Sequence, residues 1–130
     1  MNYSDAQLNC QNKFGHFHGG LFEPRHFNTN QLVYNEALNF ISAYEADFWL
    51  GINDLANQGQ YVYASDGQEV VDGMWKSDQP NGANERCVGY YNVLTNYHYD
   101  YAGWLDRPCS DLKFPICQPT GTYCVIQISI

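Results

Sequence analysis

Four side chains that offer oxygen atoms stand in two places along the chain, each followed closely by a cysteine. They are Gln79, Asn81, Glu85 and Asp106. Cys87 follows the first three and Cys109 follows the fourth, so a disulfide between these cysteines would bring the two places together. Carboxylate and amide oxygens are the ligands that Ca²⁺ prefers, because this hard cation takes about 6–8 oxygens in a flexible geometry. The four residues therefore predict a Ca²⁺ site on a loop.

The peptide bond between Gln79 and Pro80 bears on the same site. A cis peptide is accessible chiefly at proline, where the preference for the trans form is small. We expect a cis bond here, because it would aim the side chains of Gln79 and Asn81 in the same direction.

Four segments in this order resemble the motifs of C-type lectin-like domains. They are similar to the Trp-Ile-Gly-Leu signature, the Glu-Pro-Asn or Gln-Pro-Asp sugar motif, the Trp-Asn-Asp motif and the strand with the last cysteine. The segments are Phe48-Trp49-Leu50-Gly51-Ile52-Asn53-Asp54, Gln79-Pro80-Asn81, Trp104-Leu105-Asp106 and Phe114-Pro115-Ile116-Cys117-Gln118. The resemblance covers most of the chain, from about Ser4 to Gln118. It implies an α+β fold with two helices, mainly antiparallel strands and a long ligand loop closed by a disulfide.

The resemblance also implies a pairing of the cysteines and a role for the oxygen-bearing side chains. It implies two disulfides, Cys10–Cys117 and Cys87–Cys109. Cys124 is left over, and it is either unpaired or forms a link between subunits. In the family, the motif side chains and the backbone carbonyl of the last Asp hold Ca²⁺, and two neighbouring hydroxyls of a sugar complete the shell. Carried over, the metal ligands and part of the sugar site are Gln79, Asn81, Glu85 and Asp106, for about seven oxygens with the sugar.

Two departures from the family pattern weaken this prediction. Leu105 stands where the family has Asn, and an apolar side chain cannot bind Ca²⁺ unless water or Asp100 supplies the oxygen instead. The alternative is a solvated polar loop that has lost its sugar site. An accessory Ca²⁺ site is less expected still. Gln58, Gly82 and Arg86 occupy positions where acids would stand, and Arg86 would repel a cation.

The identity of the sugar is left open by the motif itself. In the family, Glu-Pro-Asn accompanies mannose-type ligands and Gln-Pro-Asp galactose-type ligands, whereas residues 79–81 mix the two. A tyrosine-rich passage tips the balance toward galactose, whose apolar face an aromatic ring can cover. Its candidate contacts are Tyr97, His98, Tyr99 and Tyr101. Several of these tyrosines could instead pack the loop onto the body of the domain.

Composition limits the class of protein. A chain of 130 residues makes one domain with a core, and its formal net charge of -8 argues against nucleic acid or an anionic membrane as partner. Charged residues make up only 15% and aromatic residues 16%, which suits a neutral hydrogen-bonding ligand such as a glycan. Five cysteines in a short chain predict an oxidising, secreted or extracellular setting. No apolar run is long enough for membrane insertion, and the first residues do not form a signal peptide.

The elements that must position the site are predicted from periodicity and caps. A first helix is expected from a capping box at Ser4, with Gln7 reaching back, to about Lys13. A strand over residues 17–22 follows, broken by a pair of glycines. The apolar spacing of Leu32, Val33, Leu38, Phe40 and Ile41 predicts a second helix from residue 28 or 29 to 44. Strands are predicted at 48–52, 61–63, 87–91 and 112–117, with a turn at 66–67.

The last residues alternate in polarity like a half-buried strand. We therefore divide the chain into a domain over residues 1–118 and a β-strand tail over residues 119–130. The tail either packs on the edge of the same domain, in place of a first strand that the family has, or pairs between subunits of a homodimer. An exposed edge rich in isoleucine would favour such association, and Cys124 is the candidate covalent link.

Other chemistries fit the sequence less well. His16, His18 and His26 could hold a transition metal, but no cysteine and histidine cluster with zinc spacing accompanies them. No nucleophile elbow, metalloprotease helix or phosphate loop is present, so we expect no enzymatic activity. The sequence thus predicts a Ca²⁺-dependent, carbohydrate-binding lectin. The competing class is a Ca²⁺-independent lectin-like domain that binds a protein, ice or a mineral.

Overall fold

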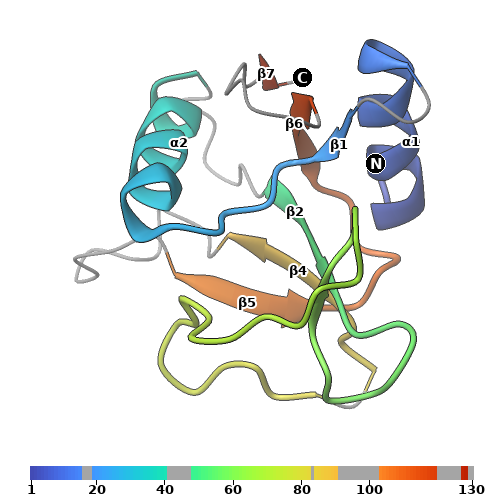
Figure 1. Ribbon diagram of the computed structural model, residues 1–130, viewed down its shortest axis with the longest axis vertical. Coiled ribbons are helices and arrows are strands. Elements are labelled where there is room, and N and C mark those ends of the chain that lie inside the picture. Colours follow the sequence, from blue (N-terminus) through green and yellow to red (C-terminus); the bar gives the residue numbers. More distant parts are fainter. Residues whose placement is uncertain (16–18, 41–47, 83, 91–102, 120–126, 129–130) are drawn as a thin grey trace.

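The computed structural model describes residues 1–15, 19–40, 48–82, 84–90, 103–119 and 127–128. It has the expected α+β architecture, with two helices and a mixed sheet (Figure 1). The elements are α1 (Tyr3–Phe14), β1 (Gly19–Leu21), α2 (Phe27–Phe40), β2 (Phe48–Asn53), β3 (Val62–Tyr63), β4 (Cys87–Tyr90), β5 (Trp104–Arg107), β6 (Phe114–Pro119) and β7 (Gln127–Ile128).

The strands form one sheet in the order β1-β6-β2-β4-β5, with β3 added to β2 and β7 added to β6. Among the strand pairs of the described residues, β2 and β6 run parallel and the others antiparallel. In Figure 1 both helices lie at one end of the molecule, on either side of β1 and β6, and the chain between β2 and β4 loops around the other end. This loop region, together with β5, carries the four predicted metal ligands.

The start of α1 differs from the prediction. The helix begins after Asn2, whose side-chain oxygen accepts a hydrogen bond from the backbone N–H of Asp5 at 2.9 Å. Ser4 therefore lies inside the first turn and is not the N-cap. Gln7 does not reach back either, because its Oε1 accepts the backbone N–H of Leu21 at 2.8 Å. The two positions have the residue types of a capping box, but the helix begins two residues earlier and the Gln7 side chain is bound by β1.

The end of α1 agrees with the prediction. The helix ends at Phe14, and Gly15 follows with a φ of 91°, a value that favours glycine. The glycine pair that was expected to interrupt the next strand instead lies within β1. A Cβ on Gly20 would come within 3.1 Å of the Gln7 amide, and a Cβ on Gly19 would collide with Phe14. These glycines allow β1 to approach α1 closely.

Strand β5 was not predicted, whereas β2, β3, β4 and β6 lie within two residues of the expected ranges. β5 pairs with β4 along its whole length, from Trp104 opposite Tyr90 to Arg107 opposite Cys87. The charged residues at its end hide the apolar pattern of a strand. Asp106 is nevertheless fully buried within it.

The core is built from the faces of α2 and the central strands. The largest fully buried side chains include Trp49 and Trp104, and Trp75 packs at the edge of the cluster that contains Trp104. On α2, Val33 is buried as predicted, but Leu32 is 64% exposed. Adjacent residues of a helix lie on different faces. Of this pair, only Val33 lies on the face that packs into the core.

The disulfides are those that the resemblance implied. Cys10–Cys117 joins α1 to β6, and Cys87–Cys109 joins the start of β4 to the chain after β5. The last strand, β7, pairs with β6 of the same chain, with Ile128 opposite Ile116 and Gln127 opposite Cys117. Cys124 lies outside the described residues. Strand pairing between subunits and the division at residues 118 and 119 stay predictions.

Candidate functional site

The structure brings together the four predicted oxygen-bearing side chains, and Asp106 lies at their centre. Asp106 is 0% exposed. Its Oδ1 accepts the backbone N–H of Asn81 at 3.0 Å, and its Oδ2 accepts that of Gly82 at 2.7 Å. The backbone N–H of Asp106 in turn donates to Oε1 of Gln79 at 3.3 Å. A carboxylate on β5 therefore holds the loop of residues 79–82 against the sheet.

Tyr61, just before β3, is a member of this site that the sequence did not single out. Its hydroxyl donates to Oδ2 of Asp106 at 2.9 Å and lies 3.4 Å from the backbone oxygen of Glu85. Burial raises the pKa of Tyr61 well above its usual value, and the hydrogen bond to Asp106 and the charge of that carboxylate raise it further. The phenol therefore stays protonated as a donor. The sequence predicted a strand at residues 61–63, but it could not show that the hydroxyl of Tyr61 meets Asp106.

The side-chain amide of Asn81 faces both acidic residues of the site. The amide orientation is assigned from these neighbours, which are both acceptors: with its nitrogen toward them, it donates to Oε1 of Glu85 at 3.1 Å and to Oδ1 of Asp106 at 2.8 Å. Turning the amide by half a turn would place its oxygen there instead, and three oxygens would then converge. Oxygens about 3 Å apart are the neighbours expected around one Ca²⁺, whose ligands lie about 2.3–2.6 Å from the ion. The amide can therefore serve the site with or without a cation.

The hydrogen bonds that Asp106 already accepts limit what its carboxylate can still bind. A carboxylate oxygen accepts about two hydrogen bonds. Oδ2 receives two, from Gly82 and Tyr61. Oδ1 receives one from the backbone of Asn81, and its second position takes the Asn81 amide nitrogen. Asp106 can thus offer one oxygen to a cation if the amide turns.

The donor set fits a hard cation in part. Asn81, Glu85 and Asp106 converge, and Gln79 adds a nearby amide oxygen that is hydrogen-bonded to the backbone. The bond between Gln79 and Pro80 is cis, as expected. Leu105 is 2% exposed and pairs with Gly89, so its side chain belongs to the packed interior. It offers no oxygen to the site.

Two arginines shape the electrostatics around the loop. Arg107 Nη1 lies 3.4 Å from Glu85 Oε2 in a partly exposed ion pair, which is weakened by solvent. Arg86 donates from Nη2 to the backbone oxygens of Asp54, at 2.8 Å, and of Leu55, at 3.3 Å. Its Nε also contacts the carboxylate of Asp54, which is 1% exposed.

Arg86 therefore supplies a fixed positive charge at the loop that follows β2. Oδ2 of Asp54 accepts the backbone N–H of Gly59 at 2.7 Å, which closes this loop on itself. The arrangement supports the expectation that an accessory cation is disfavoured here. Gln58, another position where an accessory site would need an acid, is exposed at the surface of the same loop.

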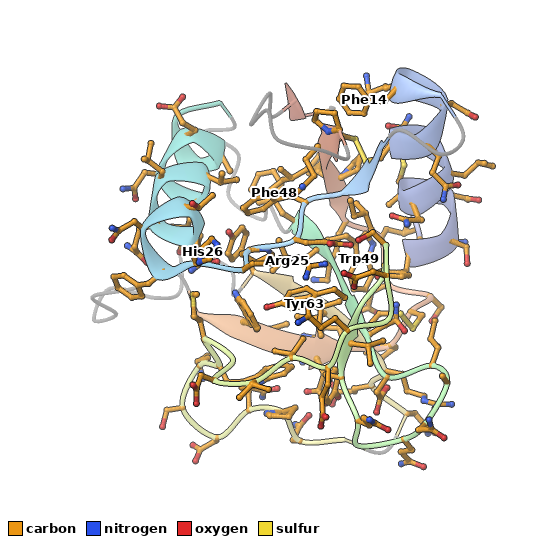
Figure 2. The ribbon with its side chains drawn as sticks, viewed as in Figure 1. Phe14, Arg25, His26, Phe48, Trp49 and Tyr63 are labelled. Carbon is orange, nitrogen blue, oxygen red and sulfur yellow. A yellow bond between two sulfur atoms is a disulfide. The ribbon has the colours of Figure 1, made fainter. Side chains whose placement is uncertain are left out.

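Residues 61–70 form a hairpin, in which the backbone N–H of Val70 donates to the backbone oxygen of Tyr61. Arg25 fastens this hairpin to the rest of the domain. Figure 2 shows its side chain beside Tyr63, and its guanidinium carbon lies 4.0 Å from the centre of that ring. It pairs with Glu23 at 2.8 Å and with Asp66 at 3.1 Å. Glu23 also accepts the backbone N–H of Ser65 at 2.7 Å. The chain before α2 thus braces the hairpin from outside the site.

The remaining predicted positions divide into two sets. The aromatic loop residues, the possible substitute ligand, two histidines and the fifth cysteine lie outside the described residues: Tyr97, His98, Tyr99, Tyr101, Asp100, His16, His18 and Cys124. His26 is exposed before α2. Within the described part of the chain, no group of three or more His, Cys, Asp or Glu side chains could hold a metal ion. The calcium candidate differs, because half of its donors are amides.

Residues 1–119 match the family model of the lectin C-type domain. The chain belongs to this family. Relatives of this C-type lectin domain include a perlucin-like protein of Mytilus galloprovincialis, 27% identical over 109 residues, which are 84% of this chain and 64% of the relative. Collectin-11 of Bos taurus is 36% identical over 118 residues, 89% of this chain and 39% of the relative. The chain thus spans less than two thirds of the length of these relatives.

Solved structures agree on the fold of this C-type lectin domain. The C-type lectin CEL-I from Cucumaria echinata is similar with a TM-score of 0.73 at 18% identity, covering 90% of this chain and 81% of that one. A Ca²⁺-dependent type II antifreeze protein in its Ca²⁺-free form is similar with a TM-score of 0.66 at 21% identity, covering 90% and 82%. At these identities the likeness concerns architecture alone.

Proposed function

We propose that this C-type lectin domain binds a neutral carbohydrate through Ca²⁺ held by Gln79, Asn81, Glu85 and Asp106. The observation that carries the proposal is the convergence of the Asn81 amide, Glu85 and Asp106, with atoms 2.8 and 3.1 Å apart, on a loop next to a disulfide. A bound Ca²⁺ would supply coordination positions for two neighbouring sugar hydroxyls. Membership of the family supports this assignment.

The described residues have different parts in such a site. Asp106 is fully buried, so we assign it to the cation and to the loop rather than to direct contact with sugar. Asn81 is exposed and Glu85 partly exposed, so these two side chains can reach a ligand from solvent. An amide both donates and accepts hydrogen bonds whereas a carboxylate only accepts, so together they can serve two hydroxyls.

A galactose-type ligand is our preference over a mannose-type one. It rests on the sequence, in which the Gln-Pro-Asn motif is mixed and the tyrosine-rich passage follows the site. Clustered tyrosines offer flat apolar faces with polar tips, which suit one face of a galactose ring.

A secreted protein that acts as a homodimer completes the proposal. Its two disulfides are stable in oxidising compartments. No helix in the described part of the chain is long and apolar enough to cross a membrane. Either Cys124 or the strand of the tail would join the subunits, and two sites on one particle would gain avidity.

The test is retention on immobilised galactose and mannose in Ca²⁺, followed by elution with a chelator. Asn81→Ala and Asn84→Ala form a matched pair, because both asparagines are exposed on the same loop and Asn81 alone is placed against the two carboxylates. We expect the parent and Asn84→Ala to be retained and released by chelator, and Asn81→Ala to pass through. Protein that stays on the column in chelator would show that it binds the sugar without Ca²⁺, and the cation would be removed from the proposal.

One observation favours the second candidate, a Ca²⁺-independent domain that binds a protein, ice or a mineral. Leu105 is buried at a position that the family uses for an oxygen ligand, and Asp106 already holds the loop through protein hydrogen bonds. A folded protein that is not retained on a broad glycan panel and gives no heat on titration with Ca²⁺ would contradict the lectin and favour this alternative.

A further inference from the structure

Asn81 is followed by Gly82, and this is the one Asn-Gly pair in the sequence. Asparagine before glycine is the pair most prone to deamidation, because a residue without a Cβ lets its backbone nitrogen approach the preceding side chain. Asn81 is exposed to solvent, and Gly82 has a φ of 71°. The sequence and exposure of this pair would make it a reactive site in a free loop.

The structure engages both reacting groups in hydrogen bonds to the same carboxylate, Asp106. The backbone N–H of Gly82, whose nitrogen would attack, donates to Oδ2 of Asp106 at 2.7 Å. The side-chain nitrogen of Asn81, which would leave, donates to Glu85 and to Asp106 at 3.1 and 2.8 Å. The backbone N–H of Asn81 also donates to Asp106, at 3.0 Å. One buried carboxylate therefore binds the nucleophile, the leaving group and the N–H of the peptide that precedes Asn81.

We propose that Asn81 is a deamidation site that the folded loop protects through Asp106, and that opening of the loop converts Asn81 to an acid. In the reaction the Gly82 nitrogen loses its proton and forms a bond to Cγ of Asn81. The bond from Cγ to the side-chain nitrogen breaks, and ammonia leaves a cyclic imide. Water then opens the ring at one carbonyl to give aspartate, or at the other to give isoaspartate.

The products change the site in opposite ways. Aspartate places a third carboxylate about 3 Å from Glu85 and Asp106 and turns Gln-Pro-Asn into Gln-Pro-Asp. Like charges at this distance repel unless a cation lies between them. Isoaspartate adds a carbon to the backbone and moves Gly82 out of reach of Asp106. We expect the aspartate form to bind Ca²⁺ more tightly than the parent and the isoaspartate form to bind it more weakly; this consequence rests on the proposed function.

The rate of deamidation is the primary test. The full chain with its disulfides intact is incubated in warm, mildly alkaline buffer, natively and in urea, and the mass increase of the peptide that contains residues 79–86 is followed by mass spectrometry. Native protein should deamidate at least about tenfold more slowly than unfolded protein, which corresponds to at least about 1.4 kcal/mol of protection. Equal rates in the native and unfolded chains would overturn the proposal.

Variants then ask whether Asp106 is the protecting group. Asp106→Asn should bring the native rate close to the unfolded one, whereas Glu36→Gln, an equal loss of charge on the exposed side of α2, should leave it unchanged. Where circular dichroism shows that Asp106→Asn is unfolded, Asp106→Glu serves instead, because it keeps the charge but displaces both carboxylate oxygens from the N–H groups of Asn81 and Gly82. A folded variant with the parent's slow rate would refute the role of Asp106.

The consequence for the cation is tested separately, by titration calorimetry of the separated aspartate and isoaspartate forms with Ca²⁺ alone. Tighter binding by the aspartate form supports the proposal. Equal binding by all forms would refute the proposed effect on Ca²⁺. If neither the parent nor the aspartate form bound Ca²⁺, the proposed function would fail, while protection measured by mass would still stand.

Discussion

Replacing Asn81 by Asp is the sharpest probe of the site. It exchanges the amide NH₂ group for an oxygen, so a hydrogen-bond donor to Glu85 and Asp106 becomes a negative charge beside them. In the parent the amide nitrogen donates to two carboxylates. In Asn81→Asp without a cation, both hydrogen bonds are lost and a third negative charge stands beside the other two. With Ca²⁺ present, the same carboxylate becomes an additional charged ligand.

The magnitude follows from the distances of 3.1 and 2.8 Å. Two charges about 3 Å apart repel by about 5 kcal/mol at an effective dielectric of about 20, and solvent at this exposed loop reduces this to about 1 kcal/mol. The lost hydrogen bonds add about 1–2 kcal/mol. In chelator the variant should therefore lose about 2–3 kcal/mol of unfolding free energy, or roughly 6–12 °C in melting temperature.

Thermal melts in chelator and in Ca²⁺, together with calorimetric titration, measure the prediction. Excess Ca²⁺ should return the variant to the stability of the parent or above, with an affinity about tenfold higher, equal to about 1.4 kcal/mol. Asn84→Asp is the matched control, since it adds the same charge to the same loop and should change neither property by much. If Asn81→Asp were as stable as the parent in chelator, the amide would not be donating to the two carboxylates.

Three further predictions follow from buried polar contacts. Tyr61→Phe should cost about 1–3 kcal/mol in urea unfolding, because it removes a donor from the buried carboxylate of β5, while Tyr63→Phe should cost less; equal losses would contradict this. Burial raises the pKa of Tyr3 to about 12 from 10.0, so stability present below pH 10 should be lost as pH rises toward 12. Tyr3→Phe should remove about 2–3 kcal/mol of this loss, measured by urea unfolding at each pH, and an unchanged slope would refute the assignment. Arg86→Met should cost about 2 kcal/mol, because it strands the buried carboxylate that follows β2, whereas Arg107→Met should cost less than about 1 kcal/mol; urea unfolding of both would expose a wrong ranking.

Much of the fold could be predicted because local pattern and tertiary structure agree. The helix end at Gly15 and the turn at Gly67 have the positive φ that favours glycine, and the strand through Trp49 is a continuous apolar run that is buried. The motif resemblance supplied what periodicity cannot, namely the pairing of the cysteines. It also predicted that Asp106 lies near Gln79, Asn81 and Glu85, although the strand that carries Asp106, β5, was not predicted.

The remaining details depend on contacts between distant parts of the chain. Gln7 has the right type and spacing for a capping box, yet Leu21 of β1 provides the partner that its side chain meets. Tyr61 could be predicted as buried but not as a donor to Asp106, since 45 positions separate the two. Side-chain hydrogen bonds of this kind follow only from the assembled sheet.

The ion pair between Arg86 and Asp54 bears on how the domain behaves when divalent ions are removed. A guanidinium that belongs to the chain cannot be washed away, so the loop after β2 keeps its positive partner when divalent ions are withdrawn. Losing the sugar and losing the fold should then be separate events. If the domain binds sugar through Ca²⁺ as proposed, a column eluted with chelator would return intact protein that can be recharged with calcium and used again.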